Sequence, residues 1–175
     1  MICNRRNKES TKEIDIILFR KELLYDIEQY AYVEADTMVT DDEHQKHQMF
    51  DIAQSGNEDL VNRTMCLAHS ECVEWLYPYT KQEVSDDSMS CNAPCAPQVY
   101  PIHLVVPDSF SATTMGLLKN LIHRYIVARV MWEWCGIVKP EKVEYWLGIA
   151  TQAKEQAKSA LMSRRTRLRR KQSIF

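Results

Sequence analysis

One segment of this 175-residue chain, Val99 to Val106, has the composition of a convincing β-strand. It combines β-branched and aromatic side chains, and prolines lie within it and directly after it. Because proline cannot donate to a β-ladder, Pro101 and Pro107 place this strand at an edge or in a small hairpin rather than inside a large sheet. The low counts of glycine (4) and proline (6) favour helices elsewhere. The sequence therefore predicts a mainly α fold, a helical bundle with a small β-hairpin or strand excursion and extended termini.

Apolar residues recur at helical spacing through the rest of the chain. Between Lys12 and Val39 they fall on two opposite sides of the predicted helix, and such a helix must meet two partners, in its own fold or in a neighbouring subunit. Pro78 and Gly136 are predicted to end helices, and Pro140 is expected in a first turn. The predicted helices cover residues 12–39, 43–54, 58–77, 112–135, and 140 to about 164 or beyond.

The same spacing predicts which side chains face the core. Trp132 and Trp134 are two residues apart and cannot share a helical face, so one of them is expected at an interface. The predicted core-facing residues are Leu60, Thr64, Leu67, Cys72, Trp75 and Leu76; then Leu118, Leu121, Ile122, Tyr125, Ala128, Arg129 and Trp132; and finally Val143, Trp146, Leu147, Ala150, Ala153, Ala157 and Leu161.

The length is that of one domain with short appended segments. We expect a basic N-terminal arm (1–11), a helical domain (12–164) that contains a loop or β excursion (81–107), and a basic C-terminal tail (165–175). The net charge of -2 hides a separation along the chain, because residues 1–12 carry +3, residues 13–155 carry -12 and residues 156–175 carry +7. The chain is an acidic body with two basic ends.

Several classes of protein are excluded by what the sequence lacks. No run of 18 apolar residues is present, and the first residues lack the apolar core and cleavage site of a signal peptide. We therefore expect a protein that is made and kept in the cytosol, with reduced thiols at its six cysteines. No phosphate-binding glycine loop, nucleophile elbow or paired-histidine metal motif occurs. A non-enzymatic protein without a cofactor is expected.

A zinc site is the sharper of the minor hypotheses. Cys66, His69 and Cys72 follow one another at three-residue spacing on one predicted helix, and Cys91 and Cys95 lie in the loop downstream. Four sulfur or nitrogen ligands are enough for zinc. Three-residue spacing, however, spreads ligands around a helix instead of bringing them together. Buried thiols and a surface loop are the simpler interpretation.

The segment from Arg164 to Lys171 near the C-terminus has the highest density of charge in the chain. It could contact nucleic-acid phosphates, it could dock on an acidic protein surface such as the body of a neighbouring copy, or it could be a solvated tail. The apolar residues Leu168, Ile174 and Phe175 favour protein docking, because apolar side chains at the end of a basic segment can anchor it. The docking candidates are Arg164, Arg165, Arg167, Arg169, Arg170, Lys171, Ile174 and Phe175.

The order of these parts resembles the head–tail connector (adaptor, or head-completion) proteins of tailed bacteriophages. The resemblance covers roughly residues 12–170, and it departs from the family in the cysteine-containing loop at 80–97 and the extra segment at 40–56. The segments that carry it are Leu121 to Val127, Trp132-Glu133-Trp134 and Glu144 to Ala150, followed by the basic tail.

The resemblance implies a structural virion protein that joins the capsid portal to the tail. Its implied partners are the portal protein, neighbouring copies in a ring, commonly of twelve, and a tail or second connector protein, with DNA passing through the lumen unbound and no membrane. It assigns residues 164–171 with Ile174 and Phe175 to portal docking, and residues 81–98 to a neighbour or tail component. No catalytic residue is implied.

Two other functions compete with this one. A nucleic-acid-binding regulator would use the arginine-rich tail, but residues 13–155 are acidic where such a protein should carry a basic face. A zinc-stabilised small adaptor protein is the other, and metal content decides that case.

Overall fold

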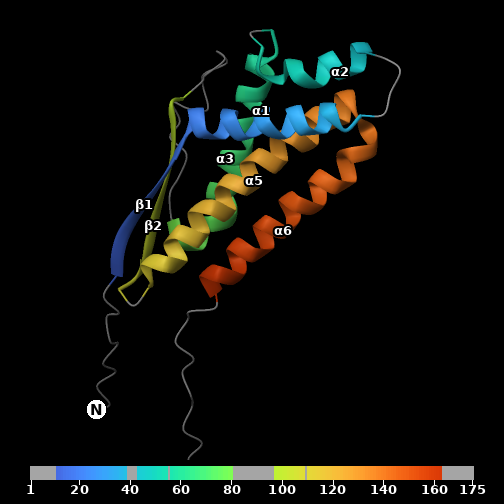
Figure 1. Cartoon of the computed structure of the whole chain (residues 1–175). Coiled ribbons are helices and arrows are strands. Elements are labelled where there is room, and N and C mark those ends of the chain that lie inside the picture. Colours follow the sequence, from blue (N-terminus) through green and yellow to red (C-terminus); the bar gives the residue numbers. More distant parts are fainter. Residues whose placement is uncertain (1–10, 39–42, 55, 81–96, 109, 163–175) are drawn as a thin grey trace, which may run out of the picture.

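A computed structural model of the chain describes residues 11–38, 43–54, 56–80, 97–108 and 110–162 (Figure 1). The predicted basic arm, except Thr11, lies outside these ranges, as do most of the 81–107 excursion and the basic tail. The elements in chain order are β1 (Thr11–Phe19), α1 (Arg20–Asp36), α2 (Glu43–Phe50), a 3-10 turn (Asp51–Ala53), α3 (Glu58–Thr80), β2 (Val99–Pro107), α5 (Ala112–Val138), a second 3-10 turn (Pro140–Lys142) and α6 (Val143–Met162). The mainly α fold with a small antiparallel sheet is confirmed.

Helix α5 runs through the centre of the fold. Six of the seven residues from Tyr125 to Met131 are buried, so nearly two turns are covered on every side. A helix that is apolar all round has to be enclosed. Helices α1, α3 and α6 pack against it, and β1 also reaches it. In Figure 1, α1 crosses α5, while α6 runs back beside it.

The sheet joins two distant parts of the chain. Strands β1 and β2 pair antiparallel, with Thr11 opposite Pro107 and Phe19 opposite Val99. The strand predicted at Val99 to Val106 is thus confirmed. Its partner strand comes from the N-terminal region and not from an adjacent hairpin arm.

The single helix predicted over residues 12–39 is wrong in its first part. Residues 11–19 form β1, and α1 begins at Arg20. The buried side chains of β1 alternate, since Ile16 and Leu18 face the core while Ile17 is 43% exposed. A period of two fits a half-buried strand. At helical spacing Ile16 and Leu18 fall on opposite sides, whereas in the strand they share the face that meets the core.

Most of the predicted helix boundaries lie within a few residues of the observed ones. Ser111 caps α5, because its hydroxyl accepts a hydrogen bond from the Thr113 backbone N–H at 3.2 Å. Pro140 stands in the first turn of the segment that leads into α6, as predicted. Gly136 does not end α5, because the helix continues to Val138, whose side chain is buried. Pro78 lies within the last turn of α3 and not beyond its end.

Most predicted core positions are buried, and the exceptions lie at the margins of the apolar faces. Leu60 (43% exposed), Leu67 (48%) and Leu147 (43%) point outward. In α3 the residues that follow the two outward leucines, Val61 and Ala68, are buried in their place. The predicted core positions found buried are Thr64, Cys72 and Leu76; Leu118, Leu121, Ile122, Tyr125 and Ala128; and Trp146, Ala150, Ala153, Ala157 and Leu161.

The two tryptophans of α5 lie on different sides of the helix, as their two-residue spacing requires. Trp134 is buried, whereas Trp132 is half-buried and lies under the guanidinium of Arg129, whose Cζ atom is 4.1 Å from the ring centre. This cation–π contact covers one face of the Trp132 ring. Arg129, predicted to face the core, is half-buried at the edge between α3 and α5.

A matched pair of substitutions tests the strand. Ile16→Ala removes a side chain that is 3% exposed and should lower the free energy of unfolding by about 2–4 kcal/mol. Ile17→Ala, the next residue on the open face, should cost less than about 1 kcal/mol. Urea unfolding followed by circular dichroism measures both. Equal losses would be incompatible with β1.

Candidate interaction surface

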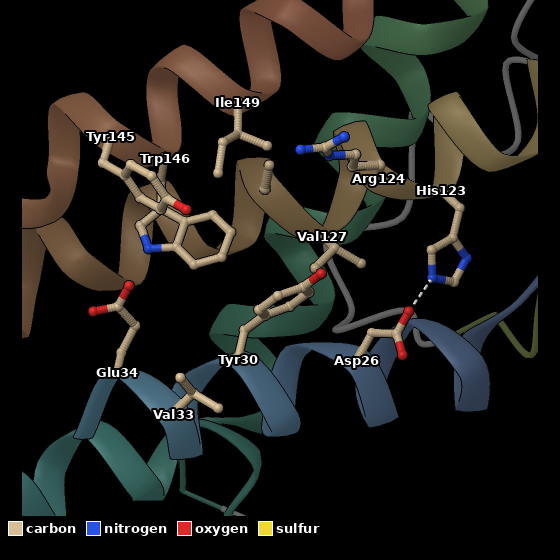
Figure 2. Close-up of a pocket in the computed structure, with 11 residues that line it drawn as sticks. Asp26, Tyr30, Val33, Glu34, His123, Arg124, Val127, Tyr145, Trp146 and Ile149 are labelled. Carbon is tan, nitrogen blue, oxygen red and sulfur yellow. Dashed lines mark hydrogen bonds and ion pairs between the residues drawn. The ribbon is translucent and has the colours of Figure 1, made fainter. Parts of the chain in front are cut away.

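A groove lies where α1, α5 and α6 meet (Figure 2). It has a volume of about 340 Å³. Helices α1 and α6 both pack on α5, and side chains from all three line the space between them. The lining residues are Asp26, Tyr30, Val33 and Glu34 from α1, His123, Arg124, Val127 and Ala128 from α5, and Tyr145, Trp146 and Ile149 from α6.

Aromatic side chains form one wall of this groove. Trp146 is buried, and the rings of Tyr30 and Tyr145 meet it edge-to-face at centroid distances of 5.2 and 5.5 Å. Both tyrosines are about half exposed, at 46% and 56%, and Val33 beside them is 55% exposed. The indole Nε1 of Trp146 is buried without a hydrogen-bond partner among the described residues. The wall is a rigid apolar surface that is open to solvent.

The polar groups of the groove are largely paired. His123 Nε2 lies 2.8 Å from Asp26 Oδ2 and joins α5 to α1. Glu34 is buried, and Lys139 Nζ donates to its carboxylate at 3.1 Å. Arg124 is exposed on the rim and makes no ion pair with the described side chains. It is the cation of the groove that is open to a partner.

A second, shallower depression continues the groove beyond the Asp26–His123 pair. Its volume is about 660 Å³. Tyr25, which is 62% exposed, lies on it together with charged side chains of α1 and α5. The two spaces together leave much of the outer side of α1 uncovered by the rest of the described chain. We call the exposed residues Tyr25, Tyr30, Val33 and Tyr145 the aromatic rim.

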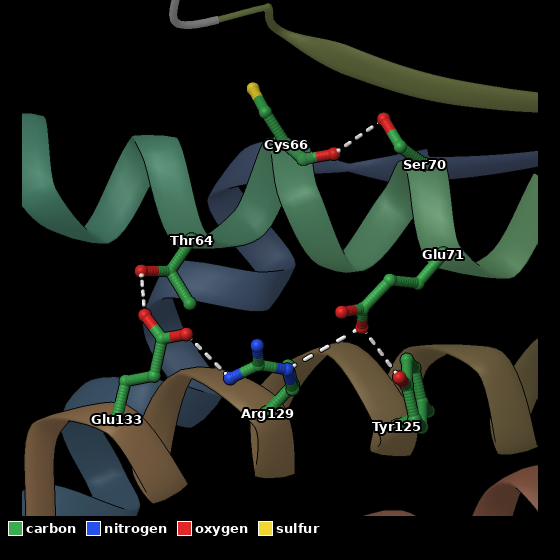
Figure 3. Close-up of polar contacts among 7 residues, drawn as sticks. All are labelled: Thr64, Cys66, Ser70, Glu71, Tyr125, Arg129 and Glu133. Atoms are coloured by element: carbon green, nitrogen blue, oxygen red, sulfur yellow. Dashed lines mark hydrogen bonds and ion pairs between the residues drawn. The ribbon is translucent and has the colours of Figure 1, made fainter. Parts of the chain in front are cut away.

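The contact between α3 and α5 depends on a chain of polar groups (Figure 3). Arg129 lies between two carboxylates, with Nη1 2.5 Å from Glu133 and Nε 3.4 Å from Glu71. Thr64 donates to Glu133 at 2.7 Å, and the Tyr125 hydroxyl donates to Glu71 at 2.6 Å. Burial, reinforced by Glu71, raises the pKa of Tyr125 well above its ordinary value. The Tyr125 hydroxyl therefore stays protonated near neutral pH and keeps donating to Glu71, and the network joins the two helices.

The residues proposed for zinc do not come together in α3. Cys72 is fully buried, and that burial raises the pKa of its thiol well above the usual value. His69 Nε2 donates a hydrogen bond to the carbonyl oxygen of Pro101 at 2.9 Å, and Cys66 Sγ lies 3.8 Å from the Tyr100 hydroxyl. No group of three potential metal ligands occurs within the described ranges.

The other residues singled out from the sequence lie outside the described part of the chain. These are Cys91 and Cys95 of the loop, and the docking candidates Arg164, Arg165, Arg167, Arg169, Arg170, Lys171, Ile174 and Phe175. The aromatic rim was not predicted as a site. Only Tyr30 of the rim belongs to the predicted second apolar side, and Leu23 and Ile27 of that side are buried, so the pattern did not indicate which side chains are exposed.

No family model, curated protein or solved structure matches this chain. In the part of the chain that the structure describes, no helix has both the length and the apolar character needed to cross a membrane.

Removing the central cation tests the polar network. Arg129→Met leaves Glu71 and Glu133 without their shared cation and should lower the free energy of unfolding by about 2–3 kcal/mol. Adding Glu71→Gln and Glu133→Gln to this variant should restore at least half of the loss, because no unpaired charge is then left between the helices. Urea titrations compare the variants. No recovery in the triple variant would mean that Arg129 acts by packing alone.

His69 makes the stability depend on pH. Burial lowers the pKa of this histidine below its ordinary 6.5, and the bond to Pro101 opposes the shift only in part. As the pH falls below about 6.5, the unfolded chain takes up a proton before the folded chain does, so stability is lost between 6.5 and the lowered folded pKa. His69→Gln should lose less stability than the wild type between pH 7.5 and 5. Parallel curves would exclude His69 as the source.

Proposed function

We propose that this protein is a non-enzymatic subunit of a virion connector that joins the capsid portal to the tail. The observation that carries the proposal is the aromatic rim, where four large side chains between 46% and 62% exposed cluster along α1 and the start of α6. Exposed aromatic residues beside a groove are the usual centre of a protein–protein interface. Their concentration on one side of the bundle is what a subunit of an assembly requires.

The chemistry of the described side chains agrees with a structural role. The acids of the α3–α5 network and of the groove are committed to ion pairs. Burial also raises the pKa of Cys135 to about 12, which leaves its thiol protonated and unreactive near neutral pH. These groups stabilise the fold and are not poised for catalysis.

The charge distribution also supports assembly. Residues 13–155 carry -12, whereas residues 156–175 carry +7. Opposite charges on two parts of one subunit favour head-to-tail contacts between copies, and such heterologous contacts close into a ring when the rotation allows. An acidic lumen would let DNA pass without being held. The basic C-terminal segment then docks on protein.

Assembly is tested with the full chain. Mass photometry and negative-stain electron microscopy, with and without the portal protein of the same virus, should reveal rings or portal-bound rings. Replacing Tyr30 and Tyr145 with serine should weaken association at least about tenfold, since rigid aromatic anchors dominate interface energies.

Tyr77→Ser is the matched control, because Tyr77 is 48% exposed on α3, on a different helix from the aromatic rim. It should leave association unchanged. A chain that stays monomeric at all concentrations and does not bind the portal contradicts the proposed function.

A further inference from the structure

Along the outer edge of β1, the backbone groups have no partner strand among the described residues. The Arg20 N–H donates to the Gln98 carbonyl at 3.0 Å, and this pair directly follows the Phe19–Val99 pair. The backbone N–H and C=O groups of the even-numbered residues of β1 therefore point toward β2 and form hydrogen bonds with it. In an antiparallel pair the alternate residues direct their N–H and C=O groups away from the partner strand. The backbone groups of Glu13, Asp15 and Ile17 therefore point outward, and no other described strand pairs with them.

The outer edge of β2 is protected in a way that the edge of β1 is not. Its outward positions include Pro101 and Pro107, which have no N–H to donate. The Pro101 carbonyl is bonded to His69 of α3, and the Pro107 carbonyl accepts the Phe110 N–H at 2.9 Å. Prolines and covering helices are the usual protection of an edge strand. Strand β1 contains no proline and is nine residues long.

The side chains along the β1 edge are acidic at one end and apolar at the other. The outward-facing residues are Glu13 and Asp15, then Ile17 and Phe19, which are 43% and 46% exposed. Asp15 is also paired with His103 of β2. On the opposite face, Ile14 is only half-buried at the margin of the core. An added strand should place basic residues over the acids and an apolar residue beside Ile14.

The basic C-terminal segment has this pattern. Arg165, Arg167 and Arg169 alternate with Thr166 and Leu168. We propose that residues 165–169 of a second copy add to the edge of β1 as an antiparallel strand. In this register Arg169 faces Glu13, Arg167 faces Asp15, and Leu168 lies beside Ile14. Backbone hydrogen bonds to the free edge supply affinity, and the alternating side chains supply specificity.

The same register excludes the chain's own tail. Figure 1 shows that α6 ends at the end of the molecule where β1 begins. An antiparallel strand has to start beside Ile17, about 20 Å along β1 from Thr11, at roughly 3.3 Å per residue. Two residues, 163 and 164, connect α6 to Arg165 and span only about 7 Å. The strand therefore comes from another copy.

This inference rests on the proposed function and names a contact within the ring. Each copy gives its C-terminal segment to the next and receives one from the previous copy, which is a heterologous contact. Ile174 and Phe175 extend past the start of β1 in this register and remain free to contact the portal.

The experiment uses full-length chain in which Arg165, Arg167 and Arg169 are changed to glutamate, so that its own segment cannot compete. A synthetic peptide of residues 163–175 is added, and amide hydrogen exchange is followed by NMR. The amides of Glu13, Asp15 and Ile17 should exchange at least about tenfold more slowly with peptide, whereas those of Ile14 and Ile16 stay unchanged because β2 already protects them.

Charge reversal supplies the matched control. In a chain that keeps its own Arg165, Arg167 and Arg169, which a basic edge repels, Glu13→Arg with Asp15→Arg should abolish the protection by the wild-type peptide, and a peptide with glutamate at 165, 167 and 169 should restore it. Glu144→Arg with Glu155→Arg changes the net charge equally at exposed positions of α6 and should have no effect.

The two proposals fail separately. Unprotected β1 amides, or protection that survives the reversal at Glu13 and Asp15, overturns strand addition, while rings on the portal would still support the connector. Protection that follows the reversal pattern supports strand addition even if the portal is not bound.

Discussion

The enclosure of α5 is the constraint on which the rest of the fold depends. Its buried residues point in all directions between Tyr125 and Met131, so no single neighbour can cover them. Helix α6 covers one side and α3 another, while α1 and the sheet close the remainder. Each covering element needs only one apolar face, which leaves its other face for solvent, polar contacts or partners. The aromatic rim is the uncovered part of this arrangement.

Patterns within one element were enough to predict most of the helices and the second strand. The stripe of Trp146, Ala150, Ala153, Ala157 and Leu161 is a local pattern, and these residues are buried as predicted. The first strand was missed because Ile16, Ile17 and Leu18 are consecutive apolar residues that suit a helix as well as a strand. The pairing with Val99 to Pro107, which decides between the two, is a tertiary contact that no local pattern contains.

The candidate surface was harder to predict for a related reason. Tyr30 and Trp146 are 116 positions apart in the chain, and their contact exists only because α1 and α6 pack on the same helix. Likewise, the spacing of Cys66, His69 and Cys72 gave no indication that His69 would be bonded to Pro101 of β2. Histidine and cysteine at regular spacing suit a metal site and a helix–sheet contact equally well. In the folded chain, His69 makes the helix–sheet contact.

The pairing of Thr11 with Pro107 has a consequence for the order of folding during synthesis. A ribosome releases β1 first, and nearly ninety further residues must follow before β2 leaves the exit tunnel. Until then the apolar side chains of Ile14, Ile16 and Leu18 have no sheet partner, and the interval is long at the speed of translation. A chaperone that binds extended apolar segments would find its site in the first twenty residues. The nascent chain can complete its sheet only after its middle third has emerged.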